Sequence, residues 1–243
     1  MKRNEMQDHP KVKSSIRGTK MVITIDGPAG AGKSTVAKEL AKRLQFTYLD
    51  TGAMYRALTL KALREKEELI QEERLVKLAQ RTVIDFKMDP KGALRVYLDG
   101  QDVSEDIRSL EVTNNTFYIA RAAGVRAIMV DWQRRIGKKN NVVVEGRDAG
   151  TVIFPEAPTK FYLDADFEVR SQRRIKELQA AGKTVDENTL KSELKERDHK
   201  DMSRAVGPLK KAEGAIVIDS TDSSVQDVVE KILGILKDNG YLK

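Results

Sequence analysis

The segment GPAGAGKST, Gly27 to Thr35, constrains the fold more than any other part of the chain. Its glycines and its proline would interrupt the middle of a helix or a strand. It follows the apolar run MVITI and matches G-x-x-x-x-G-K-[ST], the pattern of a loop that joins a buried strand to a helix and gathers backbone N–H groups around a phosphate. The sequence therefore predicts a ligand site between a strand and a helix.

The residues on either side of this loop supply the context that the pattern requires. Met21 to Asp26 is short, apolar and rich in β-branched residues, which is typical of a strand buried on both faces. Apolar residues then recur every four positions from Val36 to Leu44, as in an amphipathic helix. Within the loop, Lys33 would place its charge on a transferable phosphate, and Ser34 would offer its hydroxyl to Mg²⁺.

The rest of the chain continues to alternate strands and helices. A strand over 46–50 and a helix over 51–66 complete a β-α-β-α start, which predicts an α/β fold with ligand sites at the carboxyl ends of parallel strands. Alternating side chains between about 80 and 105 predict a small antiparallel hairpin with a PKG turn, inserted into this pattern. Further strands are expected in NVVVEGRD, TKFYLDAD and AIVIDST, a charged helix-turn-helix arm over about 167–204, and a closing helix in SVQDVVEKILGILKD.

The amino-acid composition limits the kinds of ligand and partner that the chain can bind. The chain has 44 Lys and Arg against 37 Asp and Glu, and this surplus suggests an anionic partner. It has no cysteine and only two histidines, so a bound metal would be held by oxygen. Residues 1 to 20 are expected to form a flexible basic extension. Because no signal peptide and no long apolar span are evident, we expect a cytoplasmic protein without a membrane partner.

The loop alone does not name a reaction, because GTPases, ATPases and small-molecule kinases share it. A GTPase would be expected to show an NKxD guanine reader, and none is found. Among the proteins that share this loop, a kinase with a small acceptor is therefore favoured. The alternative from another class is a P-loop protein that binds nucleic acid, but aromatic residues make up only 5% of the chain, so base-stacking platforms are scarce.

Arginines recur where strands are predicted to end, and their spacing along the chain is similar to that of a known family. Arg56 lies in DTGAMYR, Arg147 in EGRD, and Arg197 and Arg204 in KERDHKDMSRAVGPL. With these residues the sequence resembles the bacterial cytidylate kinases. The resemblance is carried, in the family's order from about residue 21 to the C-terminus, by IDGPAGAGKST, LDTGAMYRALTL, VSEDIRSLEVTNN, VVVEGRDAGTVIFPEAPTKFYLDAD and KERDHKDMSRAVGPLKKAEGAIVIDST.

This resemblance implies a single domain over 21–243. Its core would be a P-loop NTPase-type parallel sheet flanked by helices, with an NMP-binding insert at about 80–123 and a helical LID at about 167–204. The implied reaction moves the γ-phosphate of ATP onto CMP or dCMP with Mg²⁺, in pyrimidine nucleotide metabolism. A monomer without a specific nucleic-acid partner is expected. A kinase for another small acceptor, such as UMP, is the nearest alternative.

The resemblance also implies roles for individual residues. The ATP phosphates would lie in the loop, on Gly27, Pro28, Ala29, Gly30, Ala31, Gly32, Lys33, Ser34 and Thr35, with Ser34 also on the metal. The acceptor would contact Thr51, Arg56, Arg126, Arg147, Asp148, Arg197, Asp201 and Arg204. Arg126 and Asp148 are the expected readers of cytosine, whose amino group would donate to Asp148. The residues expected to act on the transferred group are Lys33, Arg147, Arg174 and Arg204.

Two further expectations concern the LID and the departures from the family. Arg170 and Arg173, like Arg174, resemble LID arginines that fold over the phosphates. Phe117 stands where the family commonly has a serine that contacts the base. Residues 145–148 read EGRD where the family usually has DGRD, so Glu145 replaces an aspartate. We expect direct in-line transfer without a covalent intermediate or a general base, because a phosphate oxygen of CMP is already ionised at neutral pH.

Overall fold

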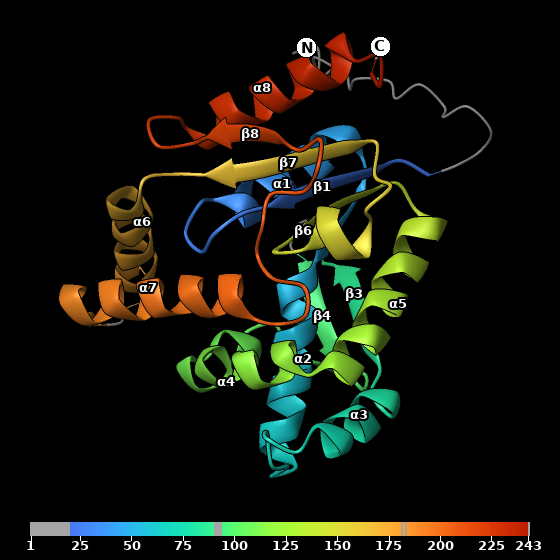
Figure 1. Ribbon diagram of the computed structural model, residues 1–243, viewed down its shortest axis with the longest axis vertical. Coiled ribbons are helices and arrows are strands. Elements are labelled where there is room, and N and C mark those ends of the chain that lie inside the picture. Colours follow the sequence, from blue (N-terminus) through green and yellow to red (C-terminus); the bar gives the residue numbers. More distant parts are fainter. Residues whose placement is uncertain (1–19, 90–93, 181, 183, 243) are drawn as a thin grey trace, which may run out of the picture.

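The computed structural model describes residues 20–89, 94–180, 182 and 184–242. Apart from Lys20, the predicted N-terminal extension lies outside these residues, as does the predicted PKG turn. The centre of the molecule is a five-stranded sheet in which all neighbouring strands are parallel (Figure 1). The strands stand in the order β2 (Thr47–Asp50), β6 (Val142–Gly146), β1 (Val22–Asp26), β7 (Thr159–Asp164) and β8 (Ile216–Asp219).

Helices cover both faces of this sheet because the central strands are apolar on both sides. Ile23 and Ile25 of β1 pack with α1 (Lys33–Leu44) and α8 (Val225–Asp238) on one face. Val22 packs on the other face with α2 (Thr51–Arg64), α3 (Glu72–Gln80) and α5 (Ala123–Lys139). None of the helices in the described part of the chain is long and apolar enough to cross a membrane.

The direction of the connections changes at β1. The strands β2 and β6 lie on one side of β1, and β7 and β8 lie on the other. In open α/β sheets, the crevice beyond the carboxyl ends of the strands at such a switch point is where ligands bind. The GPAGAGKST loop begins there, directly after β1.

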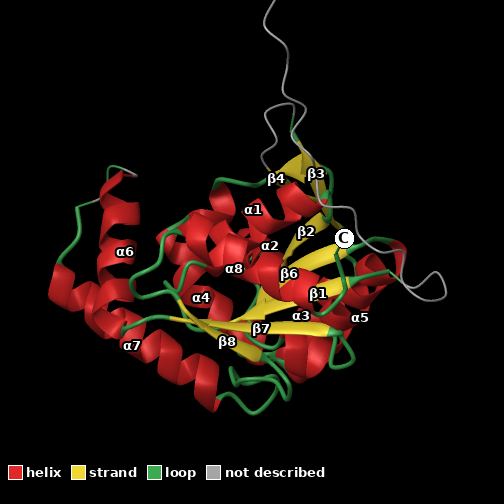
Figure 2. Ribbon diagram, turned by 90° about the horizontal axis from the view of Figure 1, so that it is seen from above, coloured by secondary structure: helices red, strands yellow, loops and turns green. Residues whose placement is uncertain are grey.

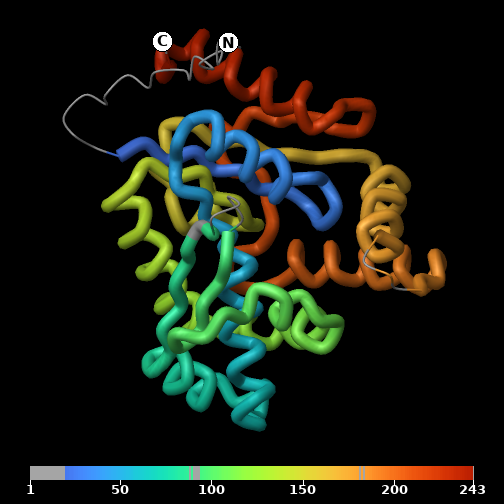
Figure 3. Tube along the Cα trace, turned by 180° about the vertical axis from the view of Figure 1, so that it is seen from behind, coloured from blue at the N-terminus to red at the C-terminus, as the bar shows by residue number. Residues whose placement is uncertain are grey.

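The alternating pattern between about 80 and 105 forms a small antiparallel sheet, as predicted. This sheet lies below the parallel one in Figure 1. It consists of β3 (Ile84–Met88), β4 (Leu94–Leu98) and β5 (Gln101–Asp102), and it buries Val96 and Leu98 against α2. A 3₁₀ turn and α4 (Leu110–Arg121) follow. Figure 3 shows this inserted part from behind, beneath the parallel sheet.

The predicted helix-turn-helix arm is confirmed as α6 (Phe167–Ala180) and α7 (Glu187–Ser203). We call these two helices the helical arm. Ile175, Leu178 and Leu190 form a small apolar cluster between them, so the arm has a core of its own. The arm lies at one edge of the molecule, and α7 runs past α4 (Figures 1 and 2).

Candidate nucleotide-binding site

The loop after β1 adopts a conformation that requires its glycines. A side chain at Gly27 would place its Cβ 2.0 Å from the backbone oxygen of Leu163 in the neighbouring strand. Gly32 has φ +86° and leads into α1 without a side-chain cap. The N–H groups of Gly30 through Ser34 find no hydrogen-bond partner among the described residues. Together they form an open set of donors at a helix N-terminus, which is a site for an anion.

Lys33 lies inside this loop and is 5% exposed. Its Nζ donates a hydrogen bond of 2.6 Å to the Pro28 carbonyl, so the chain curls over the ammonium group. Burial and the neighbouring Arg147 charge lower the pKa of Lys33 to about 7. Ser34 and Thr35 lie exposed at the mouth of the loop.

A second set of predicted residues is held at the start of α2. Asp50 caps this helix by accepting from the Ala53 N–H at 2.8 Å, and it also binds the Arg56 guanidinium at 3.0 Å. The Thr51 hydroxyl donates to the Glu145 carbonyl at 2.8 Å, which ties α2 to the end of β6. Asp50 thereby fixes the position of Arg56 at the carboxyl ends of the strands.

Positive charge is concentrated between the loop and the helical arm. Arg147 Nε donates to Asp201 Oδ2 at 2.7 Å. Arg56, Arg147 and Arg174 all lie close enough to Arg197 to repel its charge. Arg197 has no ion-pair partner within the residues that the structure describes. Like charges gathered in this way stabilise a bound polyanion, and guanidinium groups suit phosphate oxygens.

Arg126 and Asp148 form a buried ion pair at the base of this region, with side chains 2% and 4% exposed. Arg126 also donates to the Ala120 carbonyl at 3.0 Å, and the second oxygen of Asp148 lies 3.6 Å from Arg204. Next to them, burial raises the pKa of Tyr55 to about 12. The Tyr55 hydroxyl and Arg126 Nε are buried without a partner among the described residues, so this end of the site has polar groups to offer a ligand.

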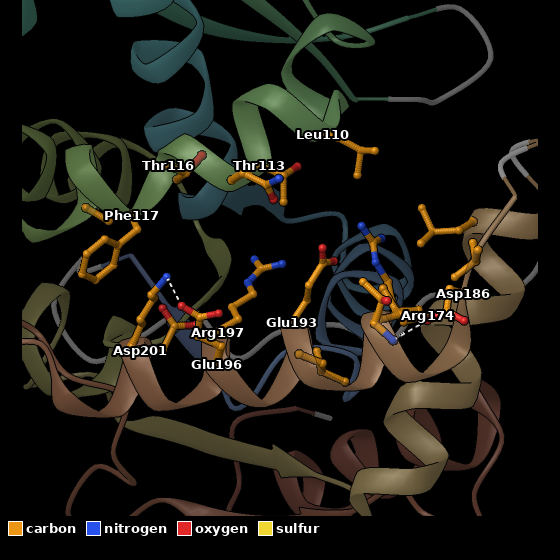
Figure 4. Close-up of a pocket in the computed structure, with 18 of the residues that line it drawn as sticks. Leu110, Thr113, Thr116, Phe117, Arg174, Asp186, Glu193, Glu196, Arg197 and Asp201 are labelled. Atoms are coloured by element: carbon orange, nitrogen blue, oxygen red, sulfur yellow. Dashed lines mark hydrogen bonds and ion pairs between the residues drawn. The ribbon is translucent and has the colours of Figure 1, made fainter. Parts of the chain in front are cut away.

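A groove of 480 Å³ separates α4 from the helical arm (Figure 4). Arg174, Arg197 and Asp201 line it from the arm, and Phe117 lines it from α4. The Phe117 ring reaches toward α7, where the Lys200 ammonium lies 5.4 Å from the ring centroid. Phe117 therefore presents an aromatic face to the groove.

Two of the arginines assigned to the LID do not face this groove. Arg170 is 8% exposed and lies behind the loop, where it donates to the Ala29 carbonyl. Arg173 donates to the backbone oxygen of Ser220 at 2.6 Å and to its hydroxyl at 3.0 Å. Arg174 alone of the three lines the groove. The three are at positions i, i+3 and i+4 of one helix, so their different partners come from the segments that pack against α6, which the sequence pattern does not reveal.

Sequence reasoning assigned no role to several polar residues near the loop. Asp26 accepts from the N–H groups of Ala149 and Gly150 at 2.8 and 2.7 Å, and burial raises its pKa to about 6. Tyr48 donates to Glu145 at 2.6 Å. Asp26 and Glu145 lie in β1 and β6 at their carboxyl ends, so the position of these acids after apolar runs was a signal available in the sequence.

A phosphate-binding loop after the central strand, with the strand order described above, defines a P-loop NTPase-type fold, and the basic groove beside the loop is typical of kinases in that class. The sequence model of the cytidylate kinase family matches residues 23–238, and the chain belongs to that family. A cytidylate kinase from Desulforamulus reducens is 50% identical over 211 residues, which are 87% of this chain and 94% of that protein. The cytidylate kinase of Caldanaerobacter subterraneus subsp. tengcongensis is 48% identical over 89% of this chain and 95% of its own length.

Proposed function

We propose that the protein transfers the γ-phosphate of ATP to CMP or dCMP, giving ADP and CDP or dCDP. The observation that carries this proposal is the open loop, with its free N–H groups and Lys33, beside a groove whose arginines lack a full set of counter-charges. The loop N–H groups and Lys33 suit the donor phosphates, and the arginines of the groove suit an acceptor phosphate. The relatives that share about half of this sequence bear the name cytidylate kinase. We further propose a cytoplasmic monomer in which 80–123 is the NMP-binding insert and the helical arm is the LID.

The donor side also fits Mg²⁺. Ser34 presents an exposed hydroxyl, and the carboxylates of Asp26 and Glu145 end the two central strands near Lys33. The described residues contain no cluster of three or more acidic, histidine or cysteine side chains that could hold a metal by themselves. This suits Mg²⁺, which commonly binds through one or two protein oxygens plus substrate phosphates and water. Bound there, the ion would neutralise charge on the transferred group.

The chemistry assigned to the protein's own residues is positioning and charge stabilisation. Lys33 contacts the transferred phosphoryl group, and Arg147, Arg174 and Arg204 stabilise the charge on it. Arg56, Arg197, Asp201 and Thr51 hold the acceptor's phosphate and sugar. Arg126 and Asp148 read the base. The attacking atom is a phosphate oxygen of the acceptor, which is ionised at neutral pH, so no side chain has to remove a proton.

An acceptor panel tests this function directly. We expect ADP formation from ATP and Mg²⁺ with CMP or dCMP to exceed that with UMP, AMP, GMP or dTMP by about 10²-fold or more in kcat/KM, because Asp148 offers an acceptor that matches the cytosine amino group. A reaction without acceptor serves as the control for hydrolysis. Dominant turnover with UMP or another acceptor would make the protein a different P-loop kinase. Turnover with none, together with salt-sensitive RNA binding, would favour the nucleic-acid-binding alternative.

The lowered pKa of Lys33 predicts that ATP binds more weakly as the pH rises. In the free protein Lys33 loses its proton near pH 7, and only the protonated form pairs with phosphate. Above that pH, binding must return the proton, so the affinity should fall by up to about tenfold per pH unit. Calorimetric titrations with ATP from pH 6.5 to 9 measure this. The Lys33→Arg variant is the control, because its guanidinium stays charged and should remove the dependence. A wild-type affinity that does not change with pH would contradict the prediction.

A further inference from the structure

The phosphate-binding loop is held from behind by both helices of the helical arm. Arg170 comes from α6 and Asp198 from α7, and their side chains meet at 2.5 Å between Nη1 and Oδ2. The two residues are only 8% and 6% exposed. A charge pair in such a poorly solvated place is stronger and more rigid than one on the surface.

This buried pair grips a single loop residue at both of its backbone polar groups. The Ala29 N–H donates to Asp198 Oδ1 at 3.2 Å, and Arg170 Nη1 donates to the Ala29 carbonyl at 2.9 Å. Arg170 Nε donates in addition to the Ala165 carbonyl at 3.1 Å, which anchors the guanidinium to the chain after β7. Ala29 is thus fixed immediately before the free N–H groups of the loop.

The next residue leaves no room for the backbone to shift toward the arm. A Cβ at Gly30 would lie 2.9 Å from the Arg170 backbone oxygen, so the loop and α6 are in close contact. Gly30 has φ +78°, which turns the chain away from Ala29 and into the set of open donors. The direction of those donors therefore depends on where Arg170 and Asp198 hold Ala29.

We propose that Arg170 and Asp198 are a positioning pair that orders the loop for ATP phosphates and makes ATP affinity depend on the helical arm. The inference rests on the proposed function, since it takes ATP to be the ligand of the loop. Neither side chain needs to touch the phosphates. A glycine-rich loop that is already ordered loses less conformational entropy on binding, so the pair raises affinity by preorganisation.

Calorimetry with ATP and with CMP tests the pair. Asp198→Asn keeps the size of the side chain but removes the charge opposite Arg170, and we expect it to weaken ATP binding about tenfold or more, with CMP affinity changed less than about threefold. Asn leaves Arg170 buried without a counter-charge, which can destabilise the fold. The double variant Arg170→Met with Asp198→Leu removes both charges together. We expect it to fold and to lose ATP affinity to a similar extent, because partners in one pair are not additive.

Hydrogen exchange at the Ala29 amide gives a readout that needs no nucleotide. This N–H is bound to Asp198, so its exchange should be at least about tenfold faster in both variants than in the wild type. The matched control is Lys191→Met. Lys191 joins Glu168 at 2.5 Å and links the same two helices at the surface, without a contact to the loop. Its removal should leave both ATP affinity and Ala29 exchange unchanged.

The outcomes separate this inference from the proposed function. A wild-type protein that fails to bind ATP would overturn the proposed function. If the wild type binds ATP, unchanged ATP affinity in the folded double variant would overturn the positioning role, and so would equal losses of ATP and CMP affinity. The same loss in Lys191→Met would show that the arm acts as a whole rather than through this pair, which also contradicts the inference.

Discussion

Replacing Lys33 by methionine is expected to lower kcat about 10³-fold or more while the fold survives. The ammonium group is held by the Pro28 carbonyl in the same loop whose N–H groups are open to a phosphate. An arginine placed on the transferred group is worth about 10³ to 10⁵ in kcat, because charge is spread over the equatorial oxygens in the transition state, and we expect the Lys33 charge to act in the same way. Methionine fills a similar volume but offers no charge. Steady-state kinetics with saturating ATP and CMP measure the loss.

The same substitution should not destabilise the protein in the absence of nucleotide. Burial and Arg147 lower the pKa of Lys33 to about 7, against 10.5 for an ordinary lysine. Between these two pH values the unfolded chain binds a proton that the native state has lost, so stability rises with pH across this window, and the full cost of holding the charged form is present below pH 7. Lys33→Met removes that cost. At pH 6.5 its Tm without ligand should equal or exceed that of the wild type.

Thermal unfolding with and without ATP completes the test of Lys33. ATP should raise the Tm of the wild type, because it binds only the native state, and should raise that of Lys33→Met much less. A variant with near wild-type kcat would remove Lys33 from catalysis. A large drop in the Tm of the unliganded variant would mean instead that the hydrogen bond to Pro28 supports the loop.

The sequence predicted those parts of the fold that depend on short patterns within a single helix or strand. The strand before the loop, the antiparallel hairpin, the helical arm and the closing helix each follow from periodicity within one element, and the structure confirms them. The helix α3 was missed although Leu75, Leu78 and Ala79 have helical spacing.

Features that depend on distant contacts could not be predicted in this way. One example is the π-helical turn Ala149–Ile153, which follows β6. The N–H groups of its first two residues donate to Asp26, which is 123 and 124 residues away in the sequence. Arg170 is similar, because its neighbours in sequence make it one charge on a charged helix. Its partners are Asp198 and Ala29, and only the packing of three separate segments places them together. The sequence therefore supplied the residue types of the site but not which of them face the groove.

Replacing Asp148 by asparagine is expected to lower kcat/KM for CMP about 10²-fold or more and to change the KM for ATP less than about threefold. Asp148 is 3% exposed, its Oδ2 is bound to Arg126, and its other oxygen lies toward Arg204. A carboxylate can only accept from the base, whereas an amide can also present its NH₂ group. Both asparagine and alanine remove the counter-charge of buried Arg126, but asparagine is the better test, because its side-chain oxygen can still accept a hydrogen bond from the guanidinium.

The ratio of CMP to UMP turnover separates base reading from a general loss of packing. Uracil carries an acceptor where cytosine carries its amino group, so the amide of Asp148→Asn should lose much of the wild-type preference for CMP over UMP. Asp106→Asn is the control: it removes one acidic charge from the exposed pair with Arg64, away from the residues that line the groove, and should leave the ratio unchanged. Equal losses for CMP and ATP with an unaltered ratio would remove Asp148 from base reading. The buried Arg126–Asp148 pair would then be structural, and the specificity for the base would have to come from the groove itself, which Phe117 lines with its ring.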